Sequence, residues 1–196
     1  YLADTTYPLH PGHKILIHAG AGGMGRLLTQ IAKNRGAYVF TTVSTPEKLQ
    51  VSLAAGADHV ILYTKQDFSK EVLRITDGEG VNVVYDGVGK DTFMKSLKSL
   101  AVRGCLVLHS LNSGLPSPIS PRSLLDRSRF LTYPSLWDHI SERNTILRRA
   151  KDLFDWVQNG DLELRTWNIF KLKDAVHAHR QLESRITTGK LLLDVT

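Results

Sequence analysis

A glycine-rich stretch near the start of the chain has the residue types and spacing that bind a phosphate group. Gly20, Gly22 and Gly25 fit the pattern G-x-G-x-x-G, in which one glycine makes a tight turn, one admits a pyrophosphate to the backbone, and one lets a helix and a strand pack closely. The free N–H groups and the positive dipole end of the following helix would hold the phosphate charge. Glycine-rich turns also occur where a chain only bends sharply. The apolar run before the turn, residues 14–17, and the helix-like segment after it favour a dinucleotide site.

The residues that end the second predicted strand indicate which dinucleotide would bind. An Asp or Glu about 20 residues past the glycines would accept hydrogen bonds from the adenosine ribose. This chain has Ser44 and Thr45 there, with Lys48 one helical turn later. Hydroxyl donors and an ammonium group suit the 2′-phosphate of NADP, so we predict NADPH rather than NADH. In the alternative interpretation Ser44 only caps a helix and Lys48 is a solvated charge, and Glu47 would weaken phosphate binding by repulsion.

Two further strand ends carry polar residues. Asp86 and Gly87 follow the fourth predicted strand, and His109 ends the fifth. In a doubly wound sheet these ends line the crevice that holds the dinucleotide, where a glycine lets the backbone approach the nicotinamide ribose. We expect Asp86 to accept backbone N–H bonds in its own turn rather than to act in acid–base catalysis. His109 either lies beside the nicotinamide or is a satisfied structural group.

Other chemistries have little support in the sequence. His177 and His179 are two residues apart on a predicted helix, so they face different ways and cannot share a metal. The chain has no H-E-x-x-H, paired-cysteine or G-x-S-x-G motif. We therefore predict no metal site, and the residues point to no catalytic side chain.

The segments that carry these residues alternate between strand-like and helix-like patterns. This alternation predicts an α/β fold with a Rossmann-type, doubly wound parallel sheet. Residues 130–133 are expected to add a sixth strand at the edge. The last helix of the set is expected to be amphipathic, with Phe93, Met94, Leu97 and Leu100 on one side. The predicted strands are residues 13–18, 38–44, 59–62, 81–85 and 104–109, and the predicted helices are residues 24–34, 46–55, 68–75 and 91–101.

Beyond the fifth strand the pattern changes. Residues 112–121 contain prolines, serines and a glycine and are expected to form a loop. Residues 141–158 have helical periodicity that Asn159 and Gly160 end. Residues 161–196 are expected to form a strand, a helix at 173–184 and a second strand at 190–195, which is too little for a second domain of useful size.

Composition limits the class of protein. The 196 residues are enough for one substantial core plus an appendage, and 42% hydrophobic with 22% charged residues is ordinary for a soluble globular protein. The single cysteine, Cys105, excludes an internal disulfide and a cysteine-based zinc cluster, and we expect a buried thiol in a cytoplasmic protein with no membrane partner. The formal charge of +6 is scattered along the chain, and a solvated helix face explains its densest group, residues 143–151, better than a nucleic-acid site does.

Several independent blocks in this order resemble the zinc-free quinone oxidoreductase, or zeta-crystallin-like, branch of the medium-chain dehydrogenase/reductase superfamily. They cover nearly the whole chain. The blocks are HAGAGGMG at residues 18–25, TVS at 42–44 with EK at 47–48, AGADHVI at 55–61, VVYDGVG at 83–89, LTYPSL at 131–136, AHR at 178–180 and TTGKL at 187–191.

The resemblance implies transfer of a hydride or electrons from NADPH to a quinone or a similar conjugated carbonyl acceptor. The reaction needs little from protein side chains, because the cofactor carries the hydride. Besides the glycine turn with Gly20, Gly23 and Gly25, it implies Ser44, Lys48 and Tyr63 at the 2′-phosphate, and Gly22, Met24, Gly87 and Asn112 along the pyrophosphate and nicotinamide.

The resemblance also predicts the domain organisation. Residues 1–11 would end an inter-domain helix, residues 12–160 would form the NADP-binding domain, and residues 161–196 would return to a barrel-like catalytic domain that this sequence is expected to lack. We therefore expect NADPH binding with weak turnover, and a homodimer paired through residues 130–133. An enoyl reductase module is the alternative enzyme. A non-catalytic nucleotide- or RNA-binding protein is the alternative of another class, although no RNA motif supports it.

Overall fold

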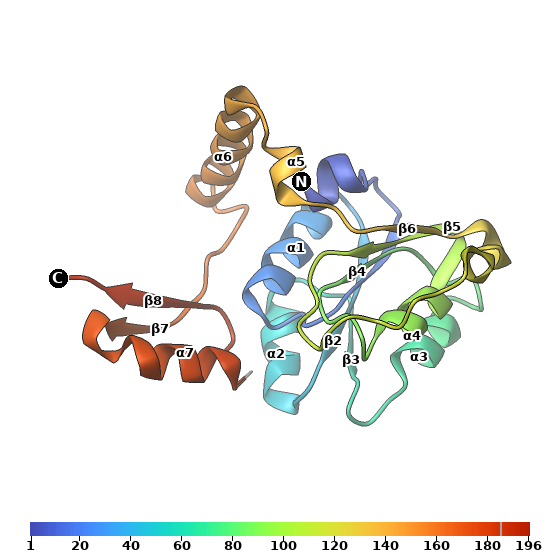
Figure 1. Cartoon of the computed structure of the whole chain (residues 1–196), viewed down its shortest axis with the longest axis horizontal. Coiled ribbons are helices and arrows are strands. Elements are labelled where there is room, and N and C mark those ends of the chain that lie inside the picture. Colours follow the sequence, from blue (N-terminus) through green and yellow to red (C-terminus); the bar gives the residue numbers. More distant parts are fainter. Residues whose placement is uncertain (185) are drawn as a thin grey trace.

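The computed structural model describes residues 1–184 and 186–196, and a six-stranded sheet lies at its centre (Figure 1). The strand order is β3-β2-β1-β4-β5-β6, and every neighbouring pair is parallel. The predicted doubly wound sheet with a sixth strand at its edge is therefore confirmed. The strands are β1 (Lys14–Ile17), β2 (Tyr38–Val43), β3 (His59–Leu62), β4 (Val81–Asp86), β5 (Leu100–Leu108) and β6 (Phe130–Thr132).

Helices cover both faces of this sheet, and each face has its own core. Along β1 the side chains alternate, because successive residues of a strand point to opposite faces. Ile15 and Ile17 pack with Leu28 of α1 on one face. Leu16 packs with Phe68 of α3 on the other. The helices of this region are α1 (Gly23–Asn34), α2 (Pro46–Ala54), α3 (Phe68–Ile75) and α4 (Phe93–Lys98).

One predicted helix is shorter than its sequence pattern indicates. Residues 91–101 were expected to present four apolar side chains on one helix face, but α4 ends at Lys98. Phe93 and Leu97, four residues apart, are buried, whereas Met94 is 51% exposed. Leu100 belongs to β5, because it pairs with the first residue of β4. The helix expected at 91–101 is therefore wrong for Leu100, because the chain joins the sheet after Lys98, whereas Met94 lies within α4 but off the face that Phe93 and Leu97 bury.

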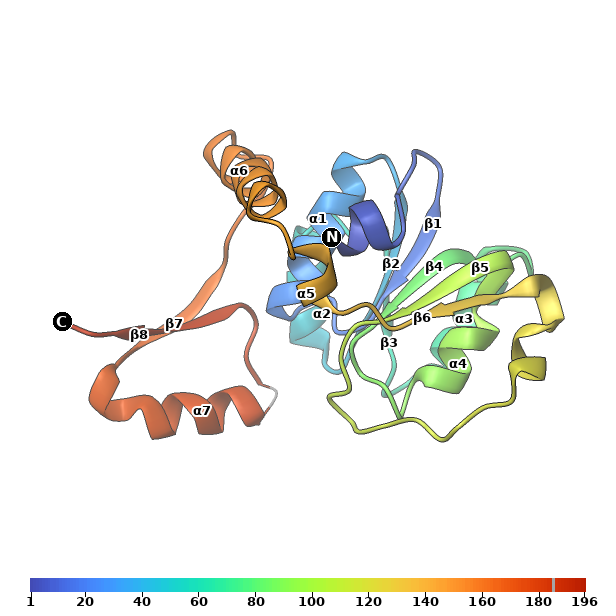
Figure 2. The same ribbon diagram turned by 45° about the horizontal axis from the view of Figure 1, so that its top comes forward.

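The elements after residue 140 lie to one side of the sheet, beyond α1 (Figures 1 and 2). Two of them, β7 and β8, pair in parallel as a separate two-stranded sheet. The predicted helix at 141–158 and the predicted strand, helix and strand that follow are confirmed. These predicted elements are α6 (Arg143–Gln158), β7 (Thr166–Lys171), α7 (Ala175–Glu183) and β8 (Lys190–Asp194). The structure also contains α5 (Leu136–His139), which the sequence pattern did not indicate, and short helical turns at Leu2–Thr6, Pro121–Leu124, Asp126–Ser128 and Leu172–Asp174.

No helix in the part of the chain that the structure describes combines the length and the apolar character needed to cross a membrane.

Candidate functional site

The site lies at the point where the strand order of the sheet reverses, between β1 and β4. Strands β1 and β4 are neighbours at its centre, with β2 and β3 beyond β1 and with β5 and β6 beyond β4. The connections that leave β1 and β4 therefore run to opposite halves of the sheet, and open α/β sheets bind ligands at such a point, outside the carboxyl ends of the strands. The glycine-rich turn, residues 19–23, follows β1 directly at this point.

The glycines of this turn have different neighbours. A Cβ atom on Gly20 would lie 2.5 Å from Thr41 Cβ, and one on Gly25 would overlap the carbonyl oxygen of Ala19. These two positions are closed by the protein itself. On Gly22 a Cβ would meet only the Ala19 carbonyl oxygen, at 3.2 Å, and on Gly23 the nearest atom would be 3.9 Å away. The turn therefore leaves its outer side open for a ligand's phosphate groups to approach the backbone.

The amino-terminal end of α1 is suited to an anion. Its N-cap is Gly22, which provides no side-chain cap, and within the described helix no acidic residue lies in the first turn. The first N–H groups of a helix have no partner inside the helix, and the dipole makes this end positive. By contrast, Thr45 caps α2 and Asp67 caps α3 with their side chains. The first turn of α1 therefore keeps its backbone donors for a ligand.

Thr45, and not Ser44, caps α2, because its hydroxyl accepts the N–H of Lys48 at 3.4 Å. Ser44 Oγ instead lies 3.4 Å from Lys48 Nζ. Partial burial lowers the pKa of Lys48. The side chain of Glu47 is engaged by Thr45, and this hydrogen bond lowers the pKa of Glu47. A hydroxyl and an ammonium group thus stand side by side at the end of β2.

Tyr63 follows the end of the neighbouring strand, β3. Its N–H donates to the carbonyl of Val43 at 3.1 Å, which extends the pairing of β2 and β3 beyond their ends. The neighbouring Thr64 donates its hydroxyl to the carbonyl of Ser44 at 3.2 Å. The ring of Tyr63 is 50% exposed. The three residues predicted at the 2′-phosphate therefore come from two adjacent strand ends.

Gly87 and Asn112 are brought together on the other side of the crevice. The N–H of Asn112 donates to the carbonyl of Gly87 at 3.3 Å, which joins the loop after β4 to the loop after β5. A Cβ on Gly87 would lie 2.7 Å from Cε1 of His109, so the imidazole packs against this glycine. Burial lowers the pKa of His109. A side chain at position 87 would therefore have to displace the partly buried ring of His109.

Asp86 organises its own turn, as the sequence predicted. Its Oδ1 atom accepts the N–H groups of Val88 at 2.8 Å and Gly89 at 3.0 Å. The hydroxyls of Thr92 and Ser96 also donate to this carboxylate. The side chain is completely buried. Asp86 is therefore a structural acceptor that fixes the loop after β4.

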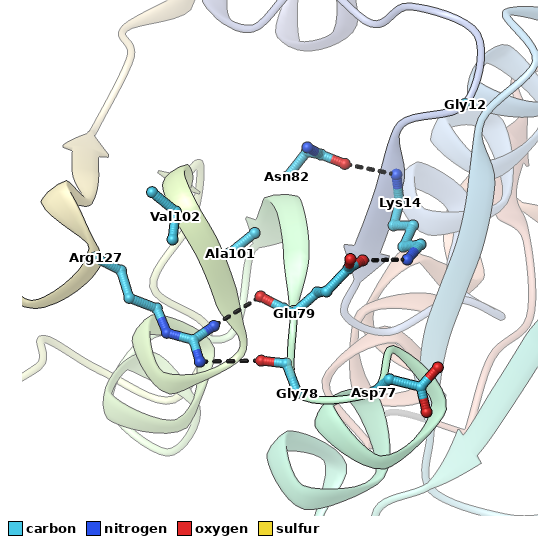
Figure 3. Close-up of a pocket in the computed structure, with 10 residues that line it drawn as sticks. Gly12, Lys14, Asp77, Gly78, Glu79, Asn82, Ala101, Val102 and Arg127 are labelled. Atoms are coloured by element: carbon cyan, nitrogen blue, oxygen red, sulfur yellow. Dashed lines mark hydrogen bonds and ion pairs between the residues drawn. The ribbon is translucent and has the colours of Figure 1, made fainter.

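A cavity of about 770 Å³ lies at the opposite edge of the sheet, near the amino ends of β1, β4 and β5 (Figure 3). Three of its charged side chains, those of Lys14, Glu79 and Arg127, contact one another or the backbone. Lys14 Nζ is 2.7 Å from Glu79 Oε2, and Arg127 donates to the carbonyls of Gly78 and Glu79. These contacts hold the turn between α3 and β4, and we assign no ligand to this cavity.

The structure adds features that sequence reasoning missed. The carbonyl oxygen of Gly189 lies 3.9 Å from the position of a Cβ on Gly23, so the turn before β8 reaches the start of α1. His18, the residue just before the glycine turn, is buried. Among the described residues, no group of three or more His, Cys, Asp or Glu side chains is placed to hold a metal ion. Cys105 is buried as predicted, and burial raises the pKa of its thiol to about 11.

Comparison with known proteins finds a matching family, similar relatives and similar solved structures. The family described as zinc-binding dehydrogenase matches residues 23–151. The chain is 42% identical over 195 residues to the 2-haloacrylate reductase of Burkholderia sp, covering 98% of this chain and 59% of the relative. The Escherichia coli quinone oxidoreductase, solved in complex with NADPH, superposes with a TM-score of 0.94 at 38% identity, covering 98% of this chain and 60% of that one.

A mycobacterial protein, also solved in complex with NADPH, superposes with a TM-score of 0.93 at 42% identity over 98% of this chain. This chain covers 60% of it. The chain thus spans about 60% of the length of the relatives that it matches.

Proposed function

The chain belongs to the zinc-binding dehydrogenase family, within the quinone oxidoreductase branch of the medium-chain dehydrogenase/reductase superfamily, and on that premise we propose that it forms the NADPH-binding part of an oxidoreductase. One observation carries the proposal. At the crevice between β1 and β4, Gly22 and Gly23 leave the uncapped start of α1 open, and Ser44 and Lys48 stand together at the end of the next strand. This arrangement suits a pyrophosphate and a 2′-phosphate together.

The residues fit the successive parts of the cofactor. The first turn of α1 would bind the pyrophosphate through its N–H groups, with Met24, 54% exposed, beside it. Ser44, Lys48 and Tyr63 would bind the 2′-phosphate. Gly87 and Asn112 would position the nicotinamide end, and the bound NADPH supplies the hydride. The protein's part is to orient the ring and to exclude water.

We propose that the acceptor of the hydride or electrons is a quinone or another conjugated compound. A conjugated carbon–carbon double bond is the second candidate, because the Burkholderia relative named 2-haloacrylate reductase is as similar to this chain as the quinone oxidoreductases are.

For the domain organisation, we propose that residues 12–160 hold the cofactor. Residues 161–196 would pack against a barrel-like catalytic domain, and the exposed Trp167, Ile169 and Leu193 on β7 and β8 suit such a contact.

We also propose a homodimer through the edge strand β6. Phe130 is 53% exposed on this strand and Tyr133, just beyond it, is 59% exposed. An unpaired strand edge is a template for pairing with a second copy. Sedimentation of the chain at several concentrations tests this step, with a monomer at all of them contradicting it.

Cofactor titration tests the binding site. We expect the chain to bind NADPH more tightly than NADH, measured by the fluorescence of the reduced nicotinamide. Lys48→Ala removes a charged partner of the 2′-phosphate and should weaken NADPH binding about tenfold while leaving NADH binding nearly unchanged. Lys70→Ala, an exposed lysine on α3, is the matched control. Equal affinity of the wild type for both cofactors would contradict the assignment.

An acceptor screen tests the reaction separately. NADPH oxidation would be followed with 1,4-benzoquinone and with 2-chloroacrylate, using this chain and a fusion carrying the barrel-like domain of the Escherichia coli relative. We expect turnover to depend on the added domain, because this chain spans only about 60% of the length of the relatives that it matches. Fast turnover by the 196-residue chain alone would contradict the expectation that the reaction needs the added domain.

A further inference from the structure

His18 is buried where three strands of the sheet end. Its side chain has no exposed surface, and its ring packs edge-on against Phe68 with the centroids 4.7 Å apart. Both ring nitrogens have hydrogen-bond partners. Nδ1 lies 2.9 Å from Oγ1 of Thr42, and Nε2 lies 2.9 Å from Oγ of Ser96. The imidazole thus bridges β2 to α4 across the end of β1.

The hydrogen-bond partners of His18 determine which of its ring nitrogens carries the proton. Ser96 Oγ is 2.8 Å from Oδ2 of Asp86, and an ionised carboxylate can only accept. The single hydroxyl hydrogen of Ser96 is therefore used on Asp86, and Ser96 must accept a hydrogen from Nε2 of His18. Burial lowers the pKa of His18, although Asp86 opposes the shift. In the neutral ring Nδ1 has a lone pair and accepts the hydroxyl of Thr42.

The chain of donors runs in one direction, from Thr42 to His18, from His18 to Ser96 and from Ser96 to Asp86. Asp86 in turn accepts the N–H groups of the loop after β4. Residue 18 is followed directly by the glycine turn, and residue 42 lies two positions before Ser44. The network therefore touches the origin of three loops that the proposed function assigns to the cofactor, those after β1, β2 and β4.

We infer that His18, held as the Nε2–H tautomer, is the positioning residue that keeps the glycine turn, the Ser44–Lys48 pair and the Gly87 loop in register for NADPH. This inference rests on the proposed function. The side chains of Thr42 and Ser96 face the ring from β2 and α4, and Phe68 covers it from α3. Asp86 is the charged group that faces it from β4, at 3.8 Å, and His109 after β5 is the other titratable group that acts on this network.

The test compares substitutions at the two ends of one strand. His18→Phe keeps a ring against Phe68 but removes both nitrogens, whereas His18→Gln keeps one N–H donor and one acceptor. His13, just before β1, provides the matched control His13→Gln. We expect His18→Phe to weaken NADPH binding by about tenfold or more, His18→Gln to recover most of it, and the control to bind like the wild type.

Nitrogen-15 NMR of the histidine-labelled chain provides a readout independent of the cofactor. At pH 7 we expect the His18 ring to carry its proton on Nε2 and a lone pair on Nδ1. A proton on Nδ1 alone would overturn the inference, as would NADPH binding by His18→Phe at the wild-type level. If His18→Phe does not fold, Thr42→Val and Ser96→Ala each remove one link and should weaken NADPH binding about threefold to tenfold.

The two failures can be told apart. A wild-type chain that binds no NADPH but shows the Nε2–H tautomer overturns the proposed function. A wild-type chain that binds NADPH while substitutions at His18, Thr42 and Ser96 leave the affinity unchanged overturns the positioning role.

Discussion

The parallel sheet and the region after it follow equally clear sequence patterns but differ in burial. Ile15, Leu16 and Leu106 in the sheet are 0% exposed. In α6 no residue is buried, and Phe154 on its apolar face is 67% exposed. Among the described residues after position 140, only Leu162, Ala178 and Thr188 are buried. Periodicity therefore predicts that a helix forms, whereas burial requires a partner surface that the periodicity does not contain.

Polar contacts join the two regions across α1. Arg26, Gln30 and Asn34 recur every four residues and so share one helix face. Gln30 Oε1 accepts the N–H of Glu163 at 2.7 Å, and its amide group donates to the carbonyl of the same residue at 3.2 Å. Asn34 donates to the carbonyl of Asp161 at 2.8 Å, and Arg26 forms an ion pair with Glu163. The link is a short backbone segment, residues 161–163, which we call the strap; these contacts are hydrogen bonds and an ion pair rather than a shared apolar core.

The comparison is tested most strongly by truncating one apolar residue in each region. Leu106→Ala leaves a cavity in a closed core and should lower the free energy of unfolding by about 2–5 kcal/mol. Phe154→Ala removes a larger but exposed side chain and should change it by less than about 0.5 kcal/mol. Urea denaturation followed by circular dichroism measures both. Similar losses in the two variants would show that α6 is covered in solution.

The glycine turn offers the next contrast. Gly25→Ala places a Cβ against the Ala19 carbonyl and 2.9 Å from Gly20 Cα, so it should cost about 1–3 kcal/mol of unfolding free energy. Gly23→Ala has open space and should stay within about 0.5 kcal/mol. Thermal denaturation of both variants measures this difference. A stable Gly25→Ala protein would mean that the turn relaxes.

The strap gives a local effect. Gln30→Ala removes both hydrogen bonds to Glu163 and should favour local opening by about 1 kcal/mol without moving the main unfolding transition. Limited proteolysis between residues 159 and 166 should become several times faster. Gln50→Ala, exposed on α2, is the matched control. Unchanged cleavage in Gln30→Ala would show that the strap is held elsewhere.

The smallest effect is a dependence on pH. Burial lowers the pKa of His18 and His109 below the ordinary 6.5. The unfolded chain therefore takes up protons near pH 6.5 while the folded chain does not, so stability falls as the pH drops below about 6.5. Urea midpoints at pH 7.5 and pH 5.5 measure the slope, which His18→Gln should reduce. A midpoint that rises on acidification would contradict the sign.

Much of this could be predicted from sequence. The six strands, the end of α6 at Asn159 and the acceptor role of Asp86 all follow from residues a few positions apart. The choice of Thr45 over Ser44 as the cap did not, because both residues suit an N-cap and only the backbone at the end of β2 separates them. Leu100 was expected in a helix for a similar reason, since helical spacing does not reveal where the chain leaves the helix and joins the sheet.

The sequence by itself determined the order of the elements and the position of the glycine turn. These depend on periodicity, capping and glycine spacing, which act within one or two turns of chain. Tertiary structure alone decided that His18 meets Ser96, 78 residues away, and that Gln30 holds Glu163, 133 residues away. Such contacts arise because parallel strands end at one edge and because α1 lies beside the strap. Chain topology therefore creates the network below the glycine turn, and no local pattern records it.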